Sequence, residues 1–522
     1  MKKIIFFLFA LLLSVNLQAQ NVTVTGTVTE ASDNEPVIGA YVKVKGTTKG
    51  TVTDMDGHYS ISVDNNTVLE FTMVGFRTED VRVGNKSVID VVLKDDVSDL
   101  NEVVVIGYGQ VKKSDLTSSI STIKGDKLDK LTTGNVMDAL QGQVNGVQVT
   151  NSGSPGSAPR VIIRGATTVN GSDPLYVVDG MPVGTNINFL DQNDIASMEV
   201  LKDASAEAIY GTRGSNGVIL ITTKKGEKGK VKFTASASMG LQTMSKPSIA
   251  GASEYEQVFD TRYTNDGNTS TYKGIQNITD AQGTNWWNEC MRDVSLMHSY
   301  NFGFSGGNDK LLYSANIGYF RQNSQYKTGY WQKINARFSM EYNFNKIVKA
   351  GIDLNPRYEN WADTPDLIGA IMGMDPTTPI MRDKSEWTDN EYSNYARSNN
   401  NETWNPVASM YRLDSHTDEY EFLTTPYVSI TPVKGLTFRT QFGVNARFQM
   451  ADSFTPQFYI DNLEQASKST ASRKFTQDVD WNWTNTLTYM HTFVKKHNLN
   501  VMGGYTVEEF QDYYLNGSSD NT

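Results

Sequence analysis

Three observations predict a mainly β protein built from several domains. The chain of 522 residues contains 42 glycines and 11% aromatic residues, yet its mean hydropathy is only −0.41. From about residue 230 onward, apolar and polar residues alternate over stretches much longer than the 5–6 residues usual for strands of a soluble sandwich. The links between these stretches alternate between long and short. Together the observations predict an N-terminal β-sandwich, an α/β domain and an incomplete antiparallel transmembrane β-barrel.

Composition excludes several functional classes. The formal net charge is −11 and the cations are scattered, so we expect no nucleic-acid binding. Cys290 is the single cysteine, which excludes a disulfide framework and multi-cysteine metal sites. The histidines form no close-spaced ligand pair, and no nucleophile–base or carboxylate pair stands out. The sequence therefore predicts no catalytic, cofactor-binding or metal-ligating residues and no enzymatic activity.

Residues 1–19 have the three-part pattern of a secretory signal peptide. Lys2 and Lys3 form a basic start, an apolar run covers Ile4 to Leu13, and Ala19 ends a cleavage site. The run is too short for a transmembrane helix, which needs about 20 apolar residues. We expect export from the cytoplasm and cleavage of this segment.

Residues 20–96 are predicted to form a small β-sandwich. Short runs rich in Val, Thr and Ile lie between turn sequences. The strands are expected at Val22–Thr29, Gly39–Lys45, His58–Val63, Thr67–Met73 and Ser87–Leu93. Asp54-Met-Asp56-Gly57 lacks the spacing of an EF-hand loop, so a tight turn at Gly57 explains it better than calcium binding. The run from Val22 to Val63 resembles the carboxypeptidase regulatory-like domain, a non-catalytic module.

Residues 97–110 are predicted to be a linker that contains one short strand. Glu102-Val103-Val104-Val105-Ile106 places four β-branched residues between Asn101 and Gly107. An exposed strand of this kind is a template for pairing with a partner strand. The alternative is a core strand of a neighbouring domain.

Residues 111–229 are predicted to form a mixed α/β domain. Strands are expected at Val144–Thr150, Arg160–Arg164, Pro174–Asp179, Ser197–Lys202 and Val218–Thr222, and short helices at Asn135–Gln141, Asp191–Met198 and Ala204–Tyr210. Gly211, Gly214 and Gly217 lack the spacing of a phosphate-binding loop, so we interpret them as turn glycines.

Five motifs of this region, in order, carry a more specific resemblance. "LNEVVVIGYG", "DALQGQVNGVQV", "PRVIIRG", "PLYVVDGMPV" and "IASMEVLKDASAEAIYGTRGSNGVILITTKKG" resemble the plug domain of TonB-dependent outer-membrane receptors, and in particular the SusC/RagA family of nutrient importers. The resemblance implies a location in the outer membrane and places the TonB box, the strand that contacts periplasmic TonB, at Glu102, Val103, Val104, Val105 and Ile106. It also implies TonB with its inner-membrane energising complex and a SusD-like surface lipoprotein as partners, and an oligosaccharide or peptide as ligand.

Residues 230–522 are predicted to form the N-terminal part of the barrel. Nine strands are expected at about 230–242, 297–305, 310–323, 330–344, 347–359, 421–431, 435–448, 477–493 and 497–510. Apolar residues such as Ile334, Phe338 and Phe442 should face lipid, and the intervening polar residues the lumen. Aromatic residues near strand ends, including Trp331, fit interfacial girdles. Tryptophans in the long loops, including Trp286-Trp287, suit either ligand binding or solvated loops.

Nine strands do not close a bacterial barrel, which has an even strand number. The sequence therefore predicts a fragment or a truncated product, and the resemblance implies that the complete barrel of the family has 22 strands. Two functions stay open besides a non-functional fragment. One is a TonB-dependent importer of nutrient oligomers. The other is a TonB-linked signal-transducing receptor, and the regulatory-like character of residues 20–96 favours the importer.

Overall fold

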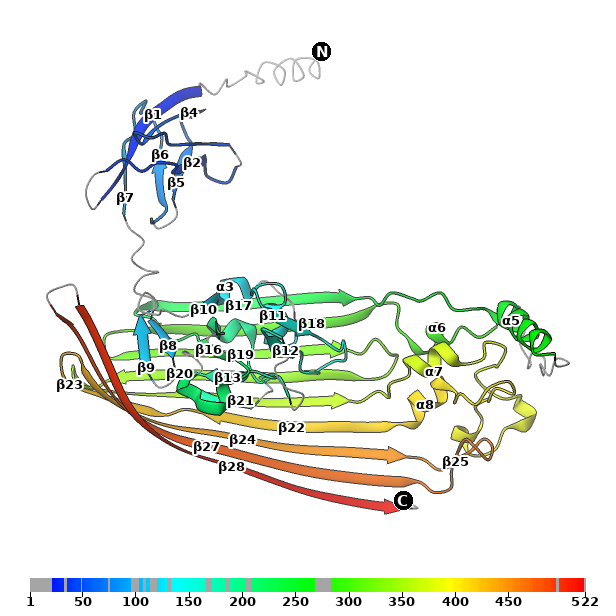
Figure 1. Cartoon of the computed structure of the whole chain (residues 1–522). Coiled ribbons are helices and arrows are strands. Elements are labelled where there is room, and N and C mark those ends of the chain that lie inside the picture. The colour runs from blue at the N-terminus through cyan, green and yellow to red at the C-terminus, as the bar shows by residue number, and fades with distance from the viewer. Residues whose placement is uncertain are drawn as a thin grey trace, which may run out of the picture. The chain divides into compact units, whose positions relative to one another are not determined.

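The computed structural model is shown in Figure 1. It describes residues 21–520 except for 32–34, 48, 74–75, 95–102, 107–108, 113–119, 129–132, 166–170, 185–186, 203–207, 268–282 and 494–496. The predicted signal peptide lies outside the described residues. The chain folds as two compact units, residues 1–104 with 111–116 and residues 105–110 with 117–522. Among the described residues, no helix is both long enough and apolar enough to cross a bilayer.

The first unit is a β-sandwich, as predicted. One sheet has the strand order β4-β1-β7 and the other β3-β2-β5-β6. The strands are β1 (Asn21–Glu30), β2 (Tyr41–Val44), β3 (Gly50–Val52), β4 (His58–Asp64), β5 (Val68–Thr72), β6 (Glu79–Arg82) and β7 (Val91–Leu93). Alternate residues of β4 are buried, and Val24, Leu69 and Phe71 lie at the centre of the shared core. The sequence did not predict β3 or β6, which are short strands at the edges of their sheet.

The turn before β4 is held by a side chain. The Asp54 Oδ1 accepts hydrogen bonds from the backbone N–H groups of Asp56 (3.0 Å) and His58 (2.8 Å). Gly57 has a φ of +74°, a conformation that glycine adopts without steric cost. The predicted tight turn is therefore present. Within the described ranges, no three acidic, histidine or cysteine side chains come together as a potential metal-ion site.

The α/β portion of the second unit is built on a mixed five-stranded sheet of order β10-β15-β16-β13-β14, beside a hairpin of β11 and β12. Its elements are β10 (Ile120–Lys124), α3 (Gly125–Leu128), β11 (Val147–Thr150), β12 (Arg160–Ile163), β13 (Leu175–Val178), β14 (Met181–Val183), β15 (Ile195–Leu201) and β16 (Val218–Thr223). β16 is central and almost wholly buried, consistent with its run of apolar residues.

The predicted helices of this portion are shorter than expected. Val136–Leu140 is a 3₁₀ helix, whose first turn is capped by the Asn135 side chain. The helix predicted at 191–198 is wrong, because only Gln192–Asp194 forms a 3₁₀ turn and β15 starts at Ile195. Pairing of β15 with both β10 and β16 outweighs the local helical pattern. Of the helix predicted at 204–210, residues 204–207 are not described, and Ala208–Gly214 is 3₁₀ with a kink at Gly211.

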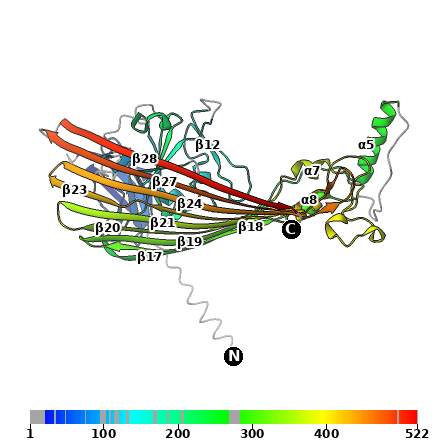
Figure 2. The same ribbon diagram turned by 90° about the horizontal axis from the view of Figure 1, so that it is seen from below.

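The rest of the second unit is dominated by one long antiparallel sheet of order β17-β18-β19-β20-β21-β22-β24-β27-β28, in which β23 pairs with β21 and β24. The strands are β17 (Gly229–Gln242), β18 (Ser295–Gly307), β19 (Leu311–Asn323), β20 (Tyr330–Asn343), β21 (Val348–Ala362), β22 (Asp414–Thr424), β23 (Tyr427–Val433), β24 (Leu436–Thr455), β27 (Thr470–Phe493) and β28 (His497–Asp520). Figure 2 shows the sheet from below, with its long strands running side by side.

β22 and β23 are two halves of one crossing. The pairs Leu354↔Thr424 and Gly351↔Tyr427 keep the same register along β21. The interruption falls at Pro426, which has no N–H to donate to a ladder. Counted in this way, the described part of the long sheet contains nine strands, as the sequence predicts. The strand expected at 421–431 begins earlier, at Asp414.

The connections also follow the prediction. Short turns at 308–310, 344–347 and 434–435 lie at one end of the sheet, and the long connections 243–294, 363–413 and 456–469 lie at the other. β17 and β28 each have one strand neighbour, so the sheet is curved but not closed among the described residues.

The two faces of the long sheet are inverted relative to a soluble protein. On β20 the polar side chains Lys333 and Arg337 are 3% and 4% exposed, whereas Ile334 and Phe338 are 45% and 38% exposed. Around β20 the polar face is covered by the α/β portion and the apolar face is open, whereas the edge strands β17 and β28 are largely exposed on both faces. This confirms the predicted lumen-facing and lipid-facing positions.

The long connections pack into a small folded region of their own (Figure 2). Its elements are α5 (Ala252–Asn265), α6 (Trp286–Cys290), α7 (Ile368–Gly373), α8 (Pro406–Arg412), β25 (Phe458–Tyr459) and β26 (Gln465–Ala466). Trp286 and Trp287 are 1% and 7% exposed in its hydrophobic core. These two tryptophans are therefore core residues rather than an exposed platform for ligands.

Candidate functional site

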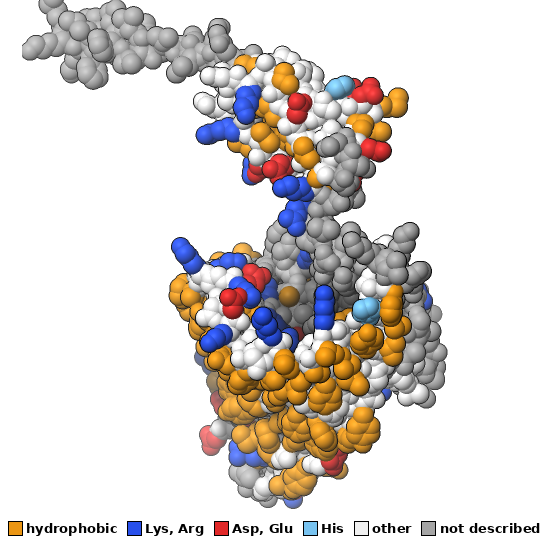
Figure 3. Space-filling model, turned by 90° about the vertical axis from the view of Figure 1, so that its left-hand side faces the viewer, with side chains coloured by type: hydrophobic (Ala, Val, Ile, Leu, Met, Phe, Trp, Pro, Cys, Tyr) orange, Lys and Arg blue, Asp and Glu red, His pale blue; other side chains and the backbone are white. Residues whose placement is uncertain are grey.

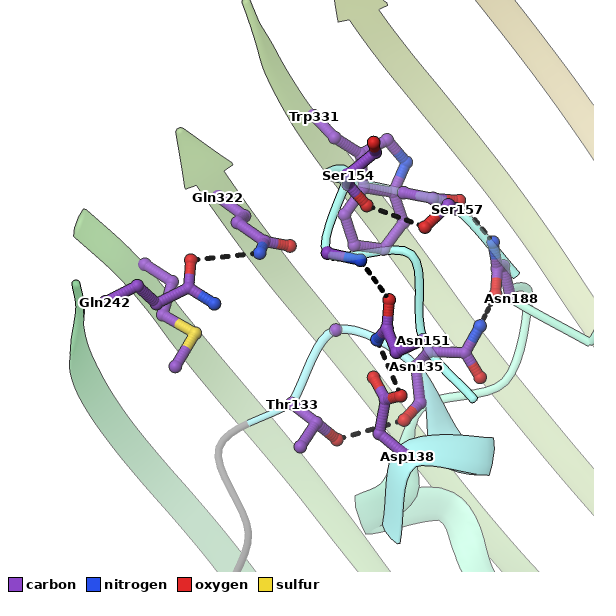
Figure 4. Close-up of a pocket in the computed structure, with 14 residues that line it drawn as sticks. Thr133, Asn135, Asp138, Asn151, Ser154, Ser157, Asn188, Gln242, Gln322 and Trp331 are labelled. Carbon is purple, nitrogen blue, oxygen red and sulfur yellow. Dashed lines mark hydrogen bonds between the residues drawn. The ribbon is translucent and has the colours of Figure 1, made fainter. Parts of the chain in front are cut away.

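The candidate site lies where the α/β portion meets the polar face of the long sheet. A cavity of about 230 Å³ opens there, lined by Thr133, Asn135, Asp138, Asn151, Asn188 and the loop 153–157 of the α/β portion, and by wall residues from β17–β20. Figure 4 shows the side chains converging from both parts. The wall residues sit near the strand ends from which the long connections leave, so the cavity lies toward that end of the sheet.

Amides and hydroxyls dominate the cavity. Asn135 donates from Nδ2 to the Oδ1 of Asn188, whose own Nδ2 donates to the Gly156 carbonyl (2.9 Å). On the wall, the Gln322 Nε2 donates to the Gln242 Oε1 (3.0 Å). The lining contains no lysine or arginine. A site of this composition can bind hydroxyl or amide groups of a ligand and offers no cation to an anionic one.

Asp138 is the one ionisable group of the lining. Burial raises the pKa of its carboxyl, and the hydrogen bond from the Asn151 Nδ2 (2.7 Å) opposes that shift. Deeper in the α/β portion, burial and the neighbouring Asp191 raise the pKa of Asp194 to about 7. Asp194 lies outside the cavity lining and is the last residue of the 3₁₀ turn that the Asp191 side chain caps.

Trp331 forms part of the floor of the cavity. Its ring is 2% exposed, and its Nε1 donates to the Glu359 Oε2 (3.2 Å). Added Cβ atoms at Gly134 and Gly156 would each come within 2.6 Å of this ring. The prediction that Trp331 belongs to an interfacial girdle is therefore wrong, because the side chain faces inward and the backbone at Gly134 and Gly156 packs closely against its ring.

Two cations of β20 hold the α/β portion against the wall. The Lys333 Nζ donates to the carbonyls of Gly134 (3.1 Å), Asn188 (3.0 Å) and Leu190 (3.2 Å). These carbonyls belong to the backbone beside the cavity, so Lys333 fixes the cavity to the strand. Its position on the polar side of the alternation was the available sequence signal, but no local pattern identifies the three carbonyls.

The second cation, Arg337, lies four residues farther along β20 on the same face of the sheet. It donates to the Thr223 Oγ1, to the Lys224 carbonyl and to the Asp353 Oδ1 (3.0 Å). Asp179 receives hydrogen bonds from the Thr223 N–H (3.1 Å) and hydroxyl, and the nearby charges of Lys225 and Arg337 help hold the pKa of its carboxyl low despite burial. Asp179 also has a positive φ of 48°, so the β13–β14 turn is fixed by both backbone and side chain.

The predicted TonB-contacting segment is partly described. Val103–Ile106 form strand β8, which pairs with β9 (Gly109–Lys112) in a two-stranded sheet. Glu102 lies outside the described residues. The expected strand is present, but it has an intramolecular partner along one edge. The segment contributes no residue to the lining of the cavity, and it remains a separate candidate site.

Two family models match the chain. Residues 24–105 match the CarboxypepD_reg-like domain, and residues 112–218 match the TonB-dependent Receptor Plug Domain. The first coincides with the β-sandwich and the segment after it, and the second with the α/β portion that carries one half of the cavity.

Curated relatives extend the likeness into the long sheet. The chain is 33% identical to the TonB-dependent receptor P3 of Formosa agariphila over 98% of this chain and 50% of that protein. It is 33% identical to the TonB-dependent receptor SusC of Bacteroides thetaiotaomicron over 81% of this chain and 44% of that one. The chain thus spans about half the length of the curated relatives it matches.

A solved structure supports the same assignment. The RagAB peptide importer in its open-open state matches with a TM-score of 0.69 and 25% identity, over 80% of this chain and 50% of that one. The match to the receptor P3 covers 98% of this chain and so includes the sandwich, the plug and the long sheet. The chain belongs to the SusC/RagA family of TonB-dependent receptors.

Proposed function

We propose that this protein imports nutrient oligomers, either oligosaccharides or peptides, across the outer membrane with energy delivered by TonB. The observation that carries the proposal is the cavity shared by plug and wall. It lies toward the long connections, and the plug supplies one of its two halves. A ligand bound there contacts the element that must move for passage, so binding and opening are coupled by shared residues.

The chemistry of the cavity fits an uncharged or weakly charged oligomer. Amide and hydroxyl groups line both halves, and peptide or sugar groups are suitable partners for them. In the proposal, a SusD-like surface lipoprotein presents cargo at the long-connection end, as the name of the RagAB relative suggests for a two-component importer. The signalling alternative finds less support, because the N-terminal domain matches the regulatory-like module.

The energy input is proposed to enter at Glu102–Ile106. Main-chain hydrogen bonds from β8 to a strand of TonB would transmit force to the plug. The substitution Val104→Pro removes one N–H donor and fixes φ, so uptake should collapse while ligand binding persists. Val104→Ile is the matched control, because it retains the donor and the β-branched side chain.

The test uses the receptor expressed from its native gene in a strain that depends on the cargo for growth. Growth of the Val104→Pro strain at the wild-type rate would refute the role of β8. Loss of ligand binding together with uptake would instead show that the substitution damages the fold.

A further inference from the structure

We propose that the short-turn end of the long sheet binds the phosphate groups of anionic phospholipids through four lysines, Lys230, Lys310, Lys346 and Lys434. The inference rests on the proposed function, because it takes the apolar face of the sheet to be embedded in the outer membrane. It adds a lipid-binding surface to that function.

The four lysines share one structural position. Lys230 lies at the start of β17, and Lys310, Lys346 and Lys434 lie in the turns β18–β19, β20–β21 and β23–β24. Each of the three described turns at this end thus carries one lysine, and the fourth lies where the chain enters the long sheet. All four are exposed, and none has a side-chain partner among the described residues. The turn β27–β28 is outside the described residues.

The acidic groups at this end do not neutralise the four lysines. Asp309 pairs with Lys228 (2.7 Å) and Glu227 with Lys232 (3.4 Å). Glu341 pairs with Lys349 (3.4 Å) and also accepts from the Tyr427 hydroxyl. Each acidic side chain described here has its own cation, so the four lysines leave an uncompensated positive charge. At the opposite end, acidic residues outnumber basic ones in the long connections.

The lysines border the apolar face directly. Val231, Phe344, Ile347 and Val433 are 45%, 61%, 46% and 58% exposed in the same strand ends and turns. Figure 3 views this end, and blue side chains stand along the rim above a band of orange ones. A long aliphatic stem lying on an apolar band with its ammonium beyond it is the arrangement that places a lysine at the headgroup level of a membrane.

The spacing favours a membrane over a protein as the occupant. Neighbouring strands lie about 4.8 Å apart, so successive turns are about 10 Å apart along the curved edge. The four charges therefore form a line that follows the sheet rather than a compact patch. A lipid leaflet meets every point of such a line, whereas a globular acidic partner would meet only part of it.

The test measures lipid selectivity of the receptor purified from outer membranes. It is reconstituted into vesicles of equal parts phosphatidylcholine and phosphatidylglycerol that carry a trace of either lipid in spin-labelled form. The motionally restricted fraction of each label gives the relative association of the two headgroups with the protein. No TonB or cargo is present, so the result does not depend on transport.

Four lysines are changed together in the test variant and in its control. The test variant carries Lys230→Gln, Lys310→Gln, Lys346→Gln and Lys434→Gln. The control carries Lys246→Gln, Lys327→Gln, Lys384→Gln and Lys468→Gln, four changes at the long-connection end. Both variants lose the same net charge, so only the place of the loss differs.

We expect wild type and control to prefer phosphatidylglycerol, and the test variant to lose that preference. Each lysine near a headgroup should raise the relative association of phosphatidylglycerol with the protein by about fivefold, and this factor should decrease as the salt concentration rises. The proposal is overturned if wild type shows no selectivity, which would favour an acidic protein as partner, or if the control loses as much as the test variant. If uptake fails to depend on TonB while lipid selectivity holds, the importer proposal falls and the lipid surface stands.

Discussion

At the scale of single residues, position on the sheet decides what a side chain does. Lys333 lies within β20 and Lys346 in the turn that follows it. Lys333 is buried and donates to three plug carbonyls, whereas Lys346 is exposed. The alternation of polar and apolar residues predicts the face on which Lys333 lies but not its hydrogen-bond partners. Those partners come from residues about 140 to 200 positions earlier, a separation over which local patterns carry no information.

The loop at 153–157 offers a matched pair of glycine substitutions. Gly153 and Gly156 both have positive φ, of 80° and 72°. An alanine at Gly153 has free space, so Gly153→Ala should cost only the backbone strain of about 1–2 kcal/mol. Gly156→Ala adds a clash with the Trp331 ring and should destabilise the plug more. Thermal unfolding followed by tryptophan fluorescence measures both, and equal shifts would show that the ring contact is not needed.

Lys333→Met tests the anchor between plug and wall. The methionine keeps the length of the side chain but leaves three carbonyls, two buried and one part-buried, without this donor, which should cost about 3 kcal/mol. Hydrogen exchange at residues 134–140 and 187–195 should accelerate while exchange in the β-sandwich stays constant. Lys346→Met, in the exposed turn, is the control and should leave exchange unchanged. An unaltered pattern in Lys333→Met would mean that the carbonyls do not depend on the ammonium.

At the scale of elements, local chemistry explains which predictions were right. Long strands with period two and their turns were predicted well, because alternation and turn residues are local signals. The helix expected at 191–198 became β15, since β10 and β16 pair with it on both sides. The cavity was not predicted at all. Asn135, Asn188 and Trp331 come from three separated segments, and none belongs to a motif.

The pairing of β8 with β9 predicts how a substitution in β9 changes the affinity of the receptor for TonB. If β9 occupies one edge of β8, weakening β9 should free that edge for a partner strand. Val111→Pro removes a donor from β9, so the affinity of the receptor for the periplasmic domain of TonB should rise. Isothermal titration with Val111→Ile as control measures the change. Weaker binding in Val111→Pro would show that β9 supports the complex instead of competing with it.

The two faces of β24 should differ in their tolerance of charge. Phe442 is 42% exposed on the apolar face, and Phe442→Arg should cost about 2–4 kcal/mol near the midplane of the bilayer. Asn445→Arg places the same charge on the polar face opposite Asp480 and should assemble normally. Gln441 is unsuitable as the control, because it donates to the Asp179 carbonyl (3.2 Å). Heat-resistant migration of the outer-membrane receptor reports assembly, and equal loss in both variants would contradict the assignment of faces.

At the scale of the whole molecule, the two ends of the long sheet differ in the structures that they present. One end presents the short turns with their lysines, and the other presents the folded long connections that approach the cavity. The sandwich and the plug each have their own buried core, whereas the long sheet has an apolar face that no described residue covers. Stability of the sheet must therefore come from lipid on that face and from strand partners at its edges.

The requirement of the long sheet for lipid and for strand partners predicts how segments of the chain behave when they are expressed separately. β17 and β28 each expose a row of unpaired backbone groups along one edge, and each such group costs several kcal/mol in hydrocarbon. Residues 21–522 alone should aggregate or be degraded rather than form a heat-modifiable monomer in the outer membrane. Residues 21–228 omit the long sheet and should be soluble with strand-rich circular dichroism, because their cores need no bilayer. A monomeric, heat-modifiable species from residues 21–522 would show that β17 and β28 can satisfy each other, since only pairing of the two edges removes the exposed backbone groups without a further strand.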